Sequence, residues 1–573
     1  MASGRKKKKK KRRAVFLTVL LVIIVILAAA AAFMYKKYSP SKEETDYSSY
    51  YELEEEGEFF VVFNNEKLEE NGYYIDGHAY ISYDAVHDHI NSRFYWDPAE
   101  EVLRYTLSDA LISAGPDTEE YTVGKEKQTA DYTICMVIGD TMYMAVEFAA
   151  EYTDISWSFY EEPGRLVISD EWGTIEYTKM KKSSAVRQKG GVKSPILAEV
   201  SKNDLVRVLE EGDNWTKVCT QDGFIGYVMN SALGRTEDVT TESEFAEEEY
   251  THITRDYAIN LAWHQVTNMT ANSYVSDVIA DAEGINVISP TWFYLDDDDG
   301  SIASLASYDY VSYCHAQGIE VWALVSNLEN SDVDTSAVLN TTSSRDNLVN
   351  QIIAAAIQYD LDGINVDFES LDSDIGDGFI QFIRELSLKC ANNDIVLSVD
   401  NYVPSSYTTM YYREEQANFA DYLILMAYDE HYSGSEEGSV ASLSFVTQGV
   451  EDTLAEGVPA EQLILGIPFY TRIWAITENE DGTYSVTSEA VDMSEVDTRI
   501  AANGASTEWL EDCGQYYTEY ENDGVTYKIW IEDQNSIEEK LKVYQEYGLA
   551  GAAFWKLGFE KSSVWDTIAE YLQ

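Results

Sequence analysis

The chain has 573 residues, of which 45% are hydrophobic and 13% aromatic, and its formal net charge is −61. The length predicts about three or four folding units, and the composition excludes a disordered acidic chain. Every acidic residue follows position 37. The part of the chain after this position has 29 basic and 101 acidic residues, so the body of the protein repels nucleic acid.

The N-terminal segment predicts a membrane anchor. Residues 14–35 are apolar or nearly so and carry no charge, a length that lets an α-helix cross a bilayer core of about 30 Å. The basic tail at 1–13 should stay in the cytoplasm by the positive-inside rule, which places the acidic body outside the membrane. A cleaved signal peptide is the alternative, because the alanines at 28–32 could offer a cleavage site. Residues 36–57 are polar and acidic, which is typical of a flexible tether.

An internal repeat follows the predicted tether. Residues 79–106 align with residues 142–169, and each copy predicts a short strand, a helical turn, an aromatic strand and a further strand. The segment 58–180 is therefore predicted to be a small α+β repeat domain. It resembles the copper amine oxidase N-terminal-like domain, although it offers no copper ligands. We assign it a spacer or binding role.

Short strand-like segments separated by Gly-Asp and Asp-Gly turns occupy residues 183–234 and predict a small all-β barrel. Trp215 after the first turn and the ending at 222–228 resemble a bacterial SH3 domain. Such modules commonly hold cell-wall peptides, and a structural spacer is the alternative. Residues 235–249 are acidic and threonine-rich, as expected of a linker.

Residues 250–573 predict a (β/α)8 barrel of the TIM type. Apolar strands alternate with amphipathic helix candidates, which is typical of a parallel barrel, and a doubly wound sheet is the competing fold. The interval 475–548 is too long for one helix, so it should contain an inserted subdomain. The eight predicted strands are 257–263, 284–294, 319–326, 361–369, 395–402, 422–429, 463–470 and 551–558.

The fourth predicted strand carries an unusual run of polar residues. Side chains alternate between the faces of a strand, so the apolar residues at 364, 366 and 368 face the helices. Asn365, Asp367 and Glu369 then point into the barrel, toward the end where barrel enzymes place their chemistry. Buried carboxylates are costly unless they are hydrogen-bonded or share a proton, so a purely structural role is disfavoured.

This strand resembles the signature of glycoside hydrolase family 18, whose members include chitinases and endo-β-N-acetylglucosaminidases. The matching positions are Asp362, Gly363, Asn365, Asp367 and Glu369. Three further segments, "MAYD" at 426–429, "GIPFYTRIW" at 466–474 and "AFWKLG" at 553–558, resemble strand-end motifs of the same family. Within the family the chain looks closest to exported spore-cortex and cell-wall members.

The resemblance implies a retaining, substrate-assisted mechanism with Glu369, Asp367 and Tyr428 as catalytic residues. Glu369 would protonate the departing oxygen, Asp367 would accept the N–H of the sugar's 2-acetamido group, and Tyr428 would donate to its oxygen. Desolvation and neighbouring charges should raise the pKa of Glu369. The expected substrate-binding residues are Trp555, Asn365, Met426, Asp429, Tyr470 and Arg472. Arg472 could meet either a substrate carboxylate or an acidic neighbour.

Asn365 departs from the chitinase pattern, which usually has an aspartate there. Asparagine cannot share a proton with Asp367 but can donate a hydrogen bond to it, so we expect Asp367 to ionise more readily. Other aromatic residues at strand ends are equally compatible with sugar contact and with core packing. They are Trp263, Trp292, Tyr294, Tyr402, Tyr470 and Trp474.

The sequence favours a membrane-anchored extracytoplasmic glycosidase of a Gram-positive bacterium that cuts beside N-acetylglucosamine, with peptidoglycan as the expected polymer. The expected partners are an amino-sugar polysaccharide, the cell wall and the membrane, with no nucleic acid. The five cysteines lie far apart, so neither a disulfide framework nor a zinc knuckle is expected. No metal or other cofactor is assigned. A chitinase or another endoglycosidase is the alternative enzyme. A non-catalytic amino-sugar-binding protein is the alternative from another class, and the presence of Glu369 argues against it.

Overall fold

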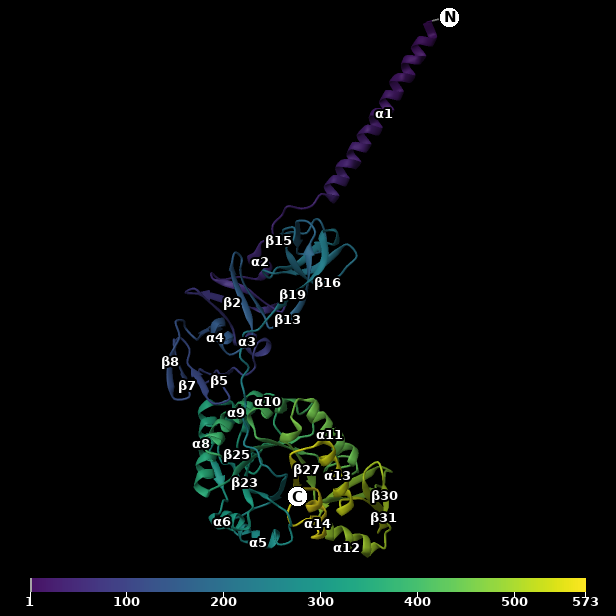
Figure 1. Cartoon of the computed structure of the whole chain (residues 1–573). Coiled ribbons are helices and arrows are strands. Elements are labelled where there is room, and N and C mark those ends of the chain that lie inside the picture. Colours follow the sequence, from purple (N-terminus) through teal and green to yellow (C-terminus); the bar gives the residue numbers. More distant parts are fainter. Residues whose placement is uncertain (1–2, 573) are drawn as a thin grey trace. The chain divides into compact units, whose positions relative to one another are not determined.

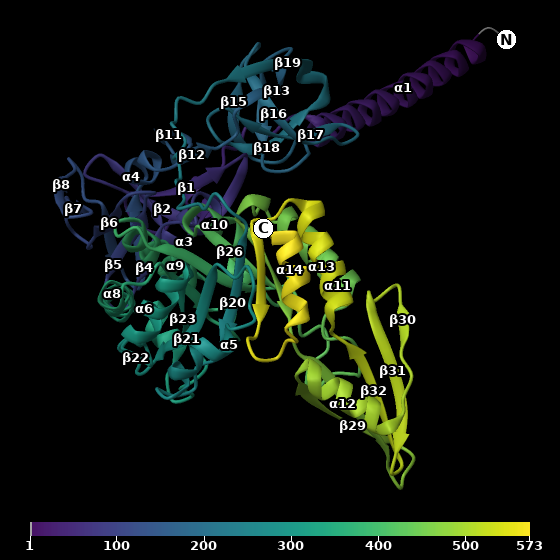
Figure 2. The ribbon, with the colours of Figure 1, turned by 60° about the horizontal axis from the view of Figure 1, so that its bottom comes forward.

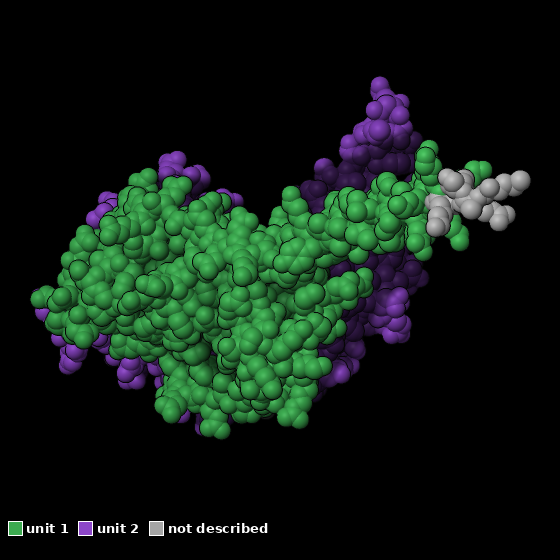
Figure 3. All heavy atoms as spheres, turned by 90° about the horizontal axis from the view of Figure 1, so that it is seen from above, with its two compact units in different colours: residues 1–94, 115–120, 129–246 green, residues 95–114, 121–128, 247–573 purple. Residues whose placement is uncertain are grey.

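The computed structural model describes residues 3–572. Met1 and Ala2 of the predicted cytoplasmic tail and Gln573 of the predicted barrel domain lie outside the described residues. The chain divides into two compact units, which Figure 3 shows in different colours. The first unit contains the residues up to 94, 115–120 and 129–246, and the second contains 95–114, 121–128 and the residues from 247 onward.

The predicted membrane segment lies in helix α1, Ser3–Tyr38 (Figure 1). Over Lys7–Tyr38 this helix is long and apolar enough to cross a membrane, judged by length and composition, and its most apolar stretch is not buried. A signal sequence has the same properties, so the uncleaved anchor stays a prediction.

A seven-stranded sheet forms the first part of the N-terminal unit. Its strands, in spatial order, are β11 (Ser156–Glu161), β12 (Gly164–Ser169), β1 (Glu58–Phe63), β2 (Glu66–Ile75), β3 (His78–Ser82), β10 (Thr141–Ala145) and β9 (Cys135–Ile138). Helix α4 (Val146–Glu151) stands between β10 and β11, and helix α3 (Tyr83–His89) between β3 and the pair β4 (Tyr95–Asp97) and β5 (Val102–Thr106). Both repeat copies therefore have the predicted order of elements.

A second seven-stranded sheet contains the predicted SH3-like segment. Its spatial order is β15 (Ile196–Val200), β14 (Ser184–Arg187), β18 (Ile225–Met229), β17 (Trp215–Thr220), β16 (Leu205–Glu210), β13 (Gly173–Met180) and β19 (Leu233–Thr241). Strands β13 and β19 pair along their lengths, so residues 235–241 of the predicted linker are part of this sheet. Small apolar side chains, among them Val186, Val206 and Val218, fill its core.

Part of the predicted flexible tether is ordered and packed. The amide of Ser41 donates to the carbonyl of Val192 at 2.7 Å, and helix α2 (Tyr47–Tyr51) follows. Tyr51 is buried and stacks on Phe60, with ring centroids 3.7 Å apart. The prediction of a free tether is therefore wrong for residues 41–51, because their tyrosines bury apolar surface against this unit.

The second unit contains the predicted eight-stranded parallel barrel. Its strands are β20 (Ile259–His264), β21 (Val287–Leu295), β23 (Glu320–Ser326), β24 (Gly363–Asp367), β25 (Val396–Tyr402), β26 (Tyr422–Met426), β27 (Leu463–Pro468) and β33 (Gly551–Trp555). Strand β20 pairs with both β21 and β33, which closes the barrel. The short strand β22 (Ile302–Ser304) adds to β21 as an antiparallel neighbour.

Helices surround this barrel, as Figures 1 and 2 show. Ile364, Val366 and Phe368 belong to the large apolar cluster that joins the strands to the helices, as the alternation along β24 predicts. The helices are α5 (Val275–Val278), α6 (Tyr308–Gln317), α7 (Thr335–Asn340), α8 (Thr342–Tyr359), α9 (Gly376–Ala391), α10 (Arg413–Phe419), α11 (Leu443–Ala455), α13 (Gln534–Tyr547) and α14 (Ser563–Leu572).

The expected insertion lies between β27 and β33. It is a five-stranded antiparallel sheet with helix α12 (Met493–Asn503), and Figure 2 shows this sheet projecting from the barrel. It starts directly after β27, a few residues before the predicted position. Its spatial order is β29 (Tyr484–Val491), β28 (Thr471–Glu478), β32 (Val525–Ile531), β31 (Gln515–Asn522) and β30 (Glu508–Leu510).

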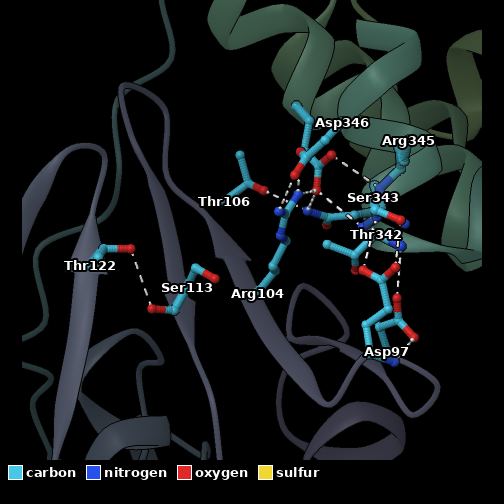
Figure 4. Close-up of polar contacts among 12 residues, drawn as sticks. Asp97, Arg104, Thr106, Ser113, Thr122, Thr342, Ser343, Arg345 and Asp346 are labelled. Atoms are coloured by element: carbon cyan, nitrogen blue, oxygen red, sulfur yellow. Dashed lines mark hydrogen bonds and ion pairs between the residues drawn. The ribbon is translucent and has the colours of Figure 1, made fainter. Parts of the chain in front are cut away.

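Strands β4 and β5 of the first repeat copy dock on the barrel helices (Figure 4). They begin the sheet that continues through β6 (Leu111–Ala114), β7 (Glu120–Val123) and β8 (Glu126–Thr129). Asp97 accepts the backbone N–H of Thr342 at 2.7 Å, which places a carboxylate at the positive N-terminus of α8. The second copy has Tyr160 and Val167 where the first has Asp97 and Arg104, so it lacks this docking chemistry.

A buried ion cluster holds this contact. Arg104 donates to Glu385 at 2.9 Å and makes two hydrogen bonds to Asp346, at 2.8 and 2.7 Å. Arg345, 0% exposed, donates to the other oxygen of Glu385 at 3.1 Å. Burial opposes the charge on Glu385, but Arg345 and Arg104 hold the pKa of this carboxyl below its usual value. Glu385 is thus the shared anion between two arginines.

Replacing this shared anion should destabilise the second unit strongly. Glu385→Gln removes the anion that buried Arg104 and Arg345 share, and we expect a loss of about 3–5 kcal/mol in the free energy of unfolding. Asp346→Asn is the matched control, with a cost of at most about 1 kcal/mol because Asp346 is solvated. Chemical denaturation of the full chain measures both. Equal, small losses for the two variants would show that the cluster does not stabilise the docking.

Candidate active site

The interior side chain of Asn365 on β24 makes hydrogen bonds to residues of three other barrel strands, β20, β21 and β25. Its Oδ1 accepts from the Trp263 indole N–H at 2.9 Å and from the Ser289 hydroxyl at 3.0 Å. Since an indole nitrogen can only donate, the Asn365 NH2 must face the other way, and it donates to Asp400 Oδ1 at 2.8 Å. The expected hydrogen bond from Asn365 to Asp367 is therefore replaced by one to Asp400 on β25.

Glu369 follows β24 and is fixed at both its backbone and its carboxylate. The Asn327 side chain accepts the Glu369 backbone N–H at 2.8 Å and donates to the Glu369 carbonyl at 3.0 Å. The Tyr402 hydroxyl donates to Glu369 Oε2 at 2.6 Å. These contacts hold the Glu369 carboxylate at the carboxyl end of the barrel strands.

The environment of Glu369 suits a general acid. Burial raises the pKa of Glu369, the Tyr402 hydrogen bond lowers it, and the charges of Asp429 and Glu329 raise it. The net shift is upward, which confirms the predicted direction.

Asp367 is the most perturbed carboxyl of the motif. Its Oδ1 is buried and has no hydrogen-bond partner among residues 3–572. Burial raises the pKa of Asp367 well above its usual value, and the charges of Asp400, Glu369 and Glu329 raise it further. The expectation that Asp367 ionises readily is therefore wrong, because the carboxyl is buried and β25 brings a second carboxyl group beside it.

Tyr428 joins this group from the end of β26. It is half-buried, and its pKa is raised first by burial and then by the charges of Asp400 and Asp367. The hydroxyl consequently stays protonated and can donate a hydrogen bond. The structure thus brings together the three predicted catalytic residues, Asp367, Glu369 and Tyr428.

The predicted substrate-binding residues lie at neighbouring strand ends. Half-buried Trp555 at the end of β33 packs edge-on against Trp263, with ring centroids 5.9 Å apart. Met426, at the end of β26, is buried. Arg472 faces an acidic neighbour, since its Nη2 lies 3.7 Å from Asp429.

Asp429 also accepts the Tyr470 hydroxyl at 2.6 Å, so Tyr470, Arg472 and Asp429 form one polar group. Because Arg472 lies beside Asp429, this contact favours pairing with an acidic neighbour over direct contact with a substrate carboxylate.

The other candidate aromatic residues have different roles. Trp292 and Trp474 are completely buried, and their indole N–H groups donate to Asn272 and to the Gly438 carbonyl, so both belong to the core. Tyr294 is half-buried. Tyr402 donates its hydroxyl to the Glu369 carboxylate.

Sequence reasoning missed four parts of the site: Asp400, the Tyr402 contact, Asn327 and Glu329. A signal for the first two was present, because alternation along 395–402 places Asp400 and Tyr402 on the same face. Asn327 and Glu329 lie in the loop after β23, where no periodic pattern indicates in which direction a side chain points.

Comparisons with known proteins agree with this geometry. The family model "Glycosyl hydrolases family 18" matches residues 223–560, and "Bacterial SH3 domain" matches residues 182–234. YdhD of Bacillus subtilis, named as a sporulation-specific glycosylase, is 27% identical over 242 residues, which cover 41% of this chain and 57% of YdhD. The cortical fragment-lytic enzyme of Bacillus subtilis is 27% identical over 267 residues, 44% of this chain and 60% of that enzyme.

Solved structures show the same fold. The spore cortex-lytic enzyme SleL of Bacillus cereus has a TM-score of 0.50 and 17% identity, over 58% of this chain and 78% of SleL. A C-terminal domain from Desulfitobacterium hafniense has a TM-score of 0.52 and 21% identity, over 56% of this chain and all of that domain. The family match spans more than half of the sequence and includes all of β24, and the chain therefore belongs to glycosyl hydrolase family 18.

Proposed function

We propose that the protein is a membrane-anchored, extracytoplasmic glycosidase that cleaves peptidoglycan next to N-acetylglucosamine with retention of configuration. The observation that carries this proposal is the meeting of Glu369, Asp367 and Tyr428 at the carboxyl end of one barrel. The family membership supplies the reaction class, which is hydrolysis of a glycosidic bond.

Glu369 acts first, as the general acid. Its raised pKa keeps a proton available, and this proton passes to the glycosidic oxygen as the bond from that oxygen to carbon one breaks. The contacts from Asn327 and Tyr402 hold the carboxyl group in place while the substrate is bound.

The substrate's own acetamide supplies the nucleophile. Its oxygen forms a bond to carbon one from the opposite face, while Asp367 accepts the acetamide N–H and Tyr428 donates its hydroxyl to the acetamide oxygen. Water then attacks carbon one, the bond to the acetamide oxygen breaks, and the water's proton returns to Glu369. Two inversions at the same carbon give retention.

The choice of peptidoglycan rests on relatives and on domain composition. A cortical fragment-lytic enzyme is among the relatives, and an SH3-like domain precedes the barrel. Chitin is the second candidate, because Asp367, Glu369 and Tyr428 would address only the N-acetylglucosamine unit that both polymers contain. Mass spectrometry of fragments released from each polymer separates the two, since the new reducing end identifies the bond that was cut.

Removing the acid should abolish turnover. Glu369→Gln preserves size and hydrogen bonding but cannot donate the proton, so we expect the release of reducing sugar from purified peptidoglycan to fall by a factor of about 100 to 10,000. Glu283→Gln, on an exposed residue, is the control and should behave like wild type. Equal release by wild type and Glu369→Gln would refute the enzymatic role of Glu369 and favour a binding protein.

Tyr402→Phe should move the pH dependence in a defined direction. The Tyr402 hydrogen bond lowers the pKa of Glu369, so its loss raises that pKa. A general acid works only when protonated, so the basic limb of the activity profile should shift to higher pH, by about half to one unit. The exposed Tyr308→Phe is the control. No shift, or a shift to lower pH, would contradict the assignment of Glu369 as the acid.

Helix α1 is proposed as the single membrane anchor, with the basic tail in the cytoplasm. After cell disruption, the full chain should stay with membranes washed at high pH and leave them only with detergent. Release of the protein into the wash would instead favour cleavage of a signal peptide.

A further inference from the structure

The register of β24 and β25 brings two carboxylates together inside the barrel. Val366 pairs with Val399, so the next residues along the two parallel strands, Asp367 and Asp400, stand side by side. Neighbouring strands lie about 4.8 Å apart, and side chains at adjacent positions of a parallel pair point the same way. Both carboxylates therefore point into the interior of the barrel.

This pair has too few hydrogen-bond donors for two negative charges. Asp400 is 2% exposed and receives one hydrogen bond, from the Asn365 NH2 at 2.8 Å. Asp367 Oδ1 is buried without a partner in the described part of the chain. A buried carboxylate oxygen that accepts nothing is costly, and a proton on the adjacent carboxyl would satisfy it.

Among residues 3–572, no basic group is among those that shift the pKa of Asp367 or Asp400. The charged groups that act on Asp367 and Asp400 are Glu369 and Glu329, from the loops after β24 and β23, and both are acids. Tyr428, from the end of β26, and Tyr402, on β25, are neutral donors whose pKa values are raised by burial first. Asp429 adds a further acid near Glu369. Two like charges this close and this buried cannot both persist.

We propose that Asp400 on β25 and Asp367 on β24 hold one proton between them, so that Asp400 is a positioning residue for the catalytic Asp367. The motif strand has Asn365 where an acid would otherwise share a proton with Asp367, and here the neighbouring strand supplies that acid. This inference rests on the proposed function of Asp367. When Asp367 accepts the acetamide N–H, the shared proton lies on Asp400, and the pair keeps a charge of −1 without exchanging a proton with solvent.

The proton count of unfolding tests the sharing directly and needs no substrate. At about pH 6 free aspartates are ionised, so unfolding of the full chain in detergent should release about one proton from this pair. Asp400→Asn can still accept from Asn365 and still donate an N–H to Asp367, but it carries no titratable proton. It should release about one proton fewer than wild type, whereas the exposed control Asp281→Asn should match wild type. Calorimetric unfolding in buffers of different ionisation enthalpy measures this number. Equal release by wild type and Asp400→Asn would overturn the proposal.

The pH profile of peptidoglycan hydrolysis gives a second readout. If the pair already has a charge of −1, Asp400→Asn changes no charge near Glu369, so the basic limb of the profile should stay in place. If Asp400 were ionised instead, the variant would remove a charge and shift that limb to lower pH by about one unit, which would refute the sharing. Asp400→Leu, which has no donor for Asp367, should lose about 100-fold in rate.

Two controls keep the outcomes distinct. Asp400→Leu can lose activity because it fails to fold, so its unfolding midpoint is measured. If the leucine variant is unstable, the test depends on Asp400→Asn. Glu369→Gln is assayed in parallel. If Glu369→Gln stays fully active, the proposed function fails while the proton count still reports on the pair. If Glu369→Gln is inactive and the proton counts are equal, only the shared proton is refuted.

Discussion

The proposed chemistry depends on the placement of several carboxyl groups inside a closed barrel, where burial opposes their ionisation. Asp367, Glu369 and Asp400 all have raised pKa values, and burial is the first cause of each. A raised pKa costs stability as the pH rises from that of a free carboxyl to that of the buried one, because over this range the folded state binds more protons than the unfolded state. In the proposed mechanism, the same penalty keeps a proton on Glu369, which has to donate it.

The rest of the second unit offsets this cost and holds the strands in register. Apolar residues on the outer face of β24 pack against the helices, while Asn365 connects β24 to β20, β21 and β25 through its side-chain hydrogen bonds. Helices α8 and α9 precede and follow β24, and the ion cluster of Arg104, Arg345 and Glu385 joins both helices to the first repeat copy. Residues 95–114 therefore help to hold the barrel helices α8 and α9 together, which is more than the role of a spacer.

Much of the barrel could be predicted from local pattern, because strand alternation and helix periodicity are properties of neighbouring residues. The run at 361–369 predicted both the interior face of β24 and the convergence of Asp367 and Glu369. Asp400 could not be assigned its role in this way, since its meeting with Asp367 depends on the register of two strands. The contact of Arg104 with Glu385 and the packing of Tyr51 on Phe60 likewise depend on distant parts of the chain, whose proximity no local pattern encodes.

The most direct test of the central claim is the configuration of the first product. Nuclear magnetic resonance of fresh hydrolysate from β-linked N-acetylglucosamine glycans distinguishes the two anomers before they equilibrate. Attack by the sugar's acetamide, guided by Asp367 and Tyr428, predicts that the β-anomer appears first. Initial formation of the α-anomer would mean a single inversion by water, and would contradict the account of how these carboxyl groups work.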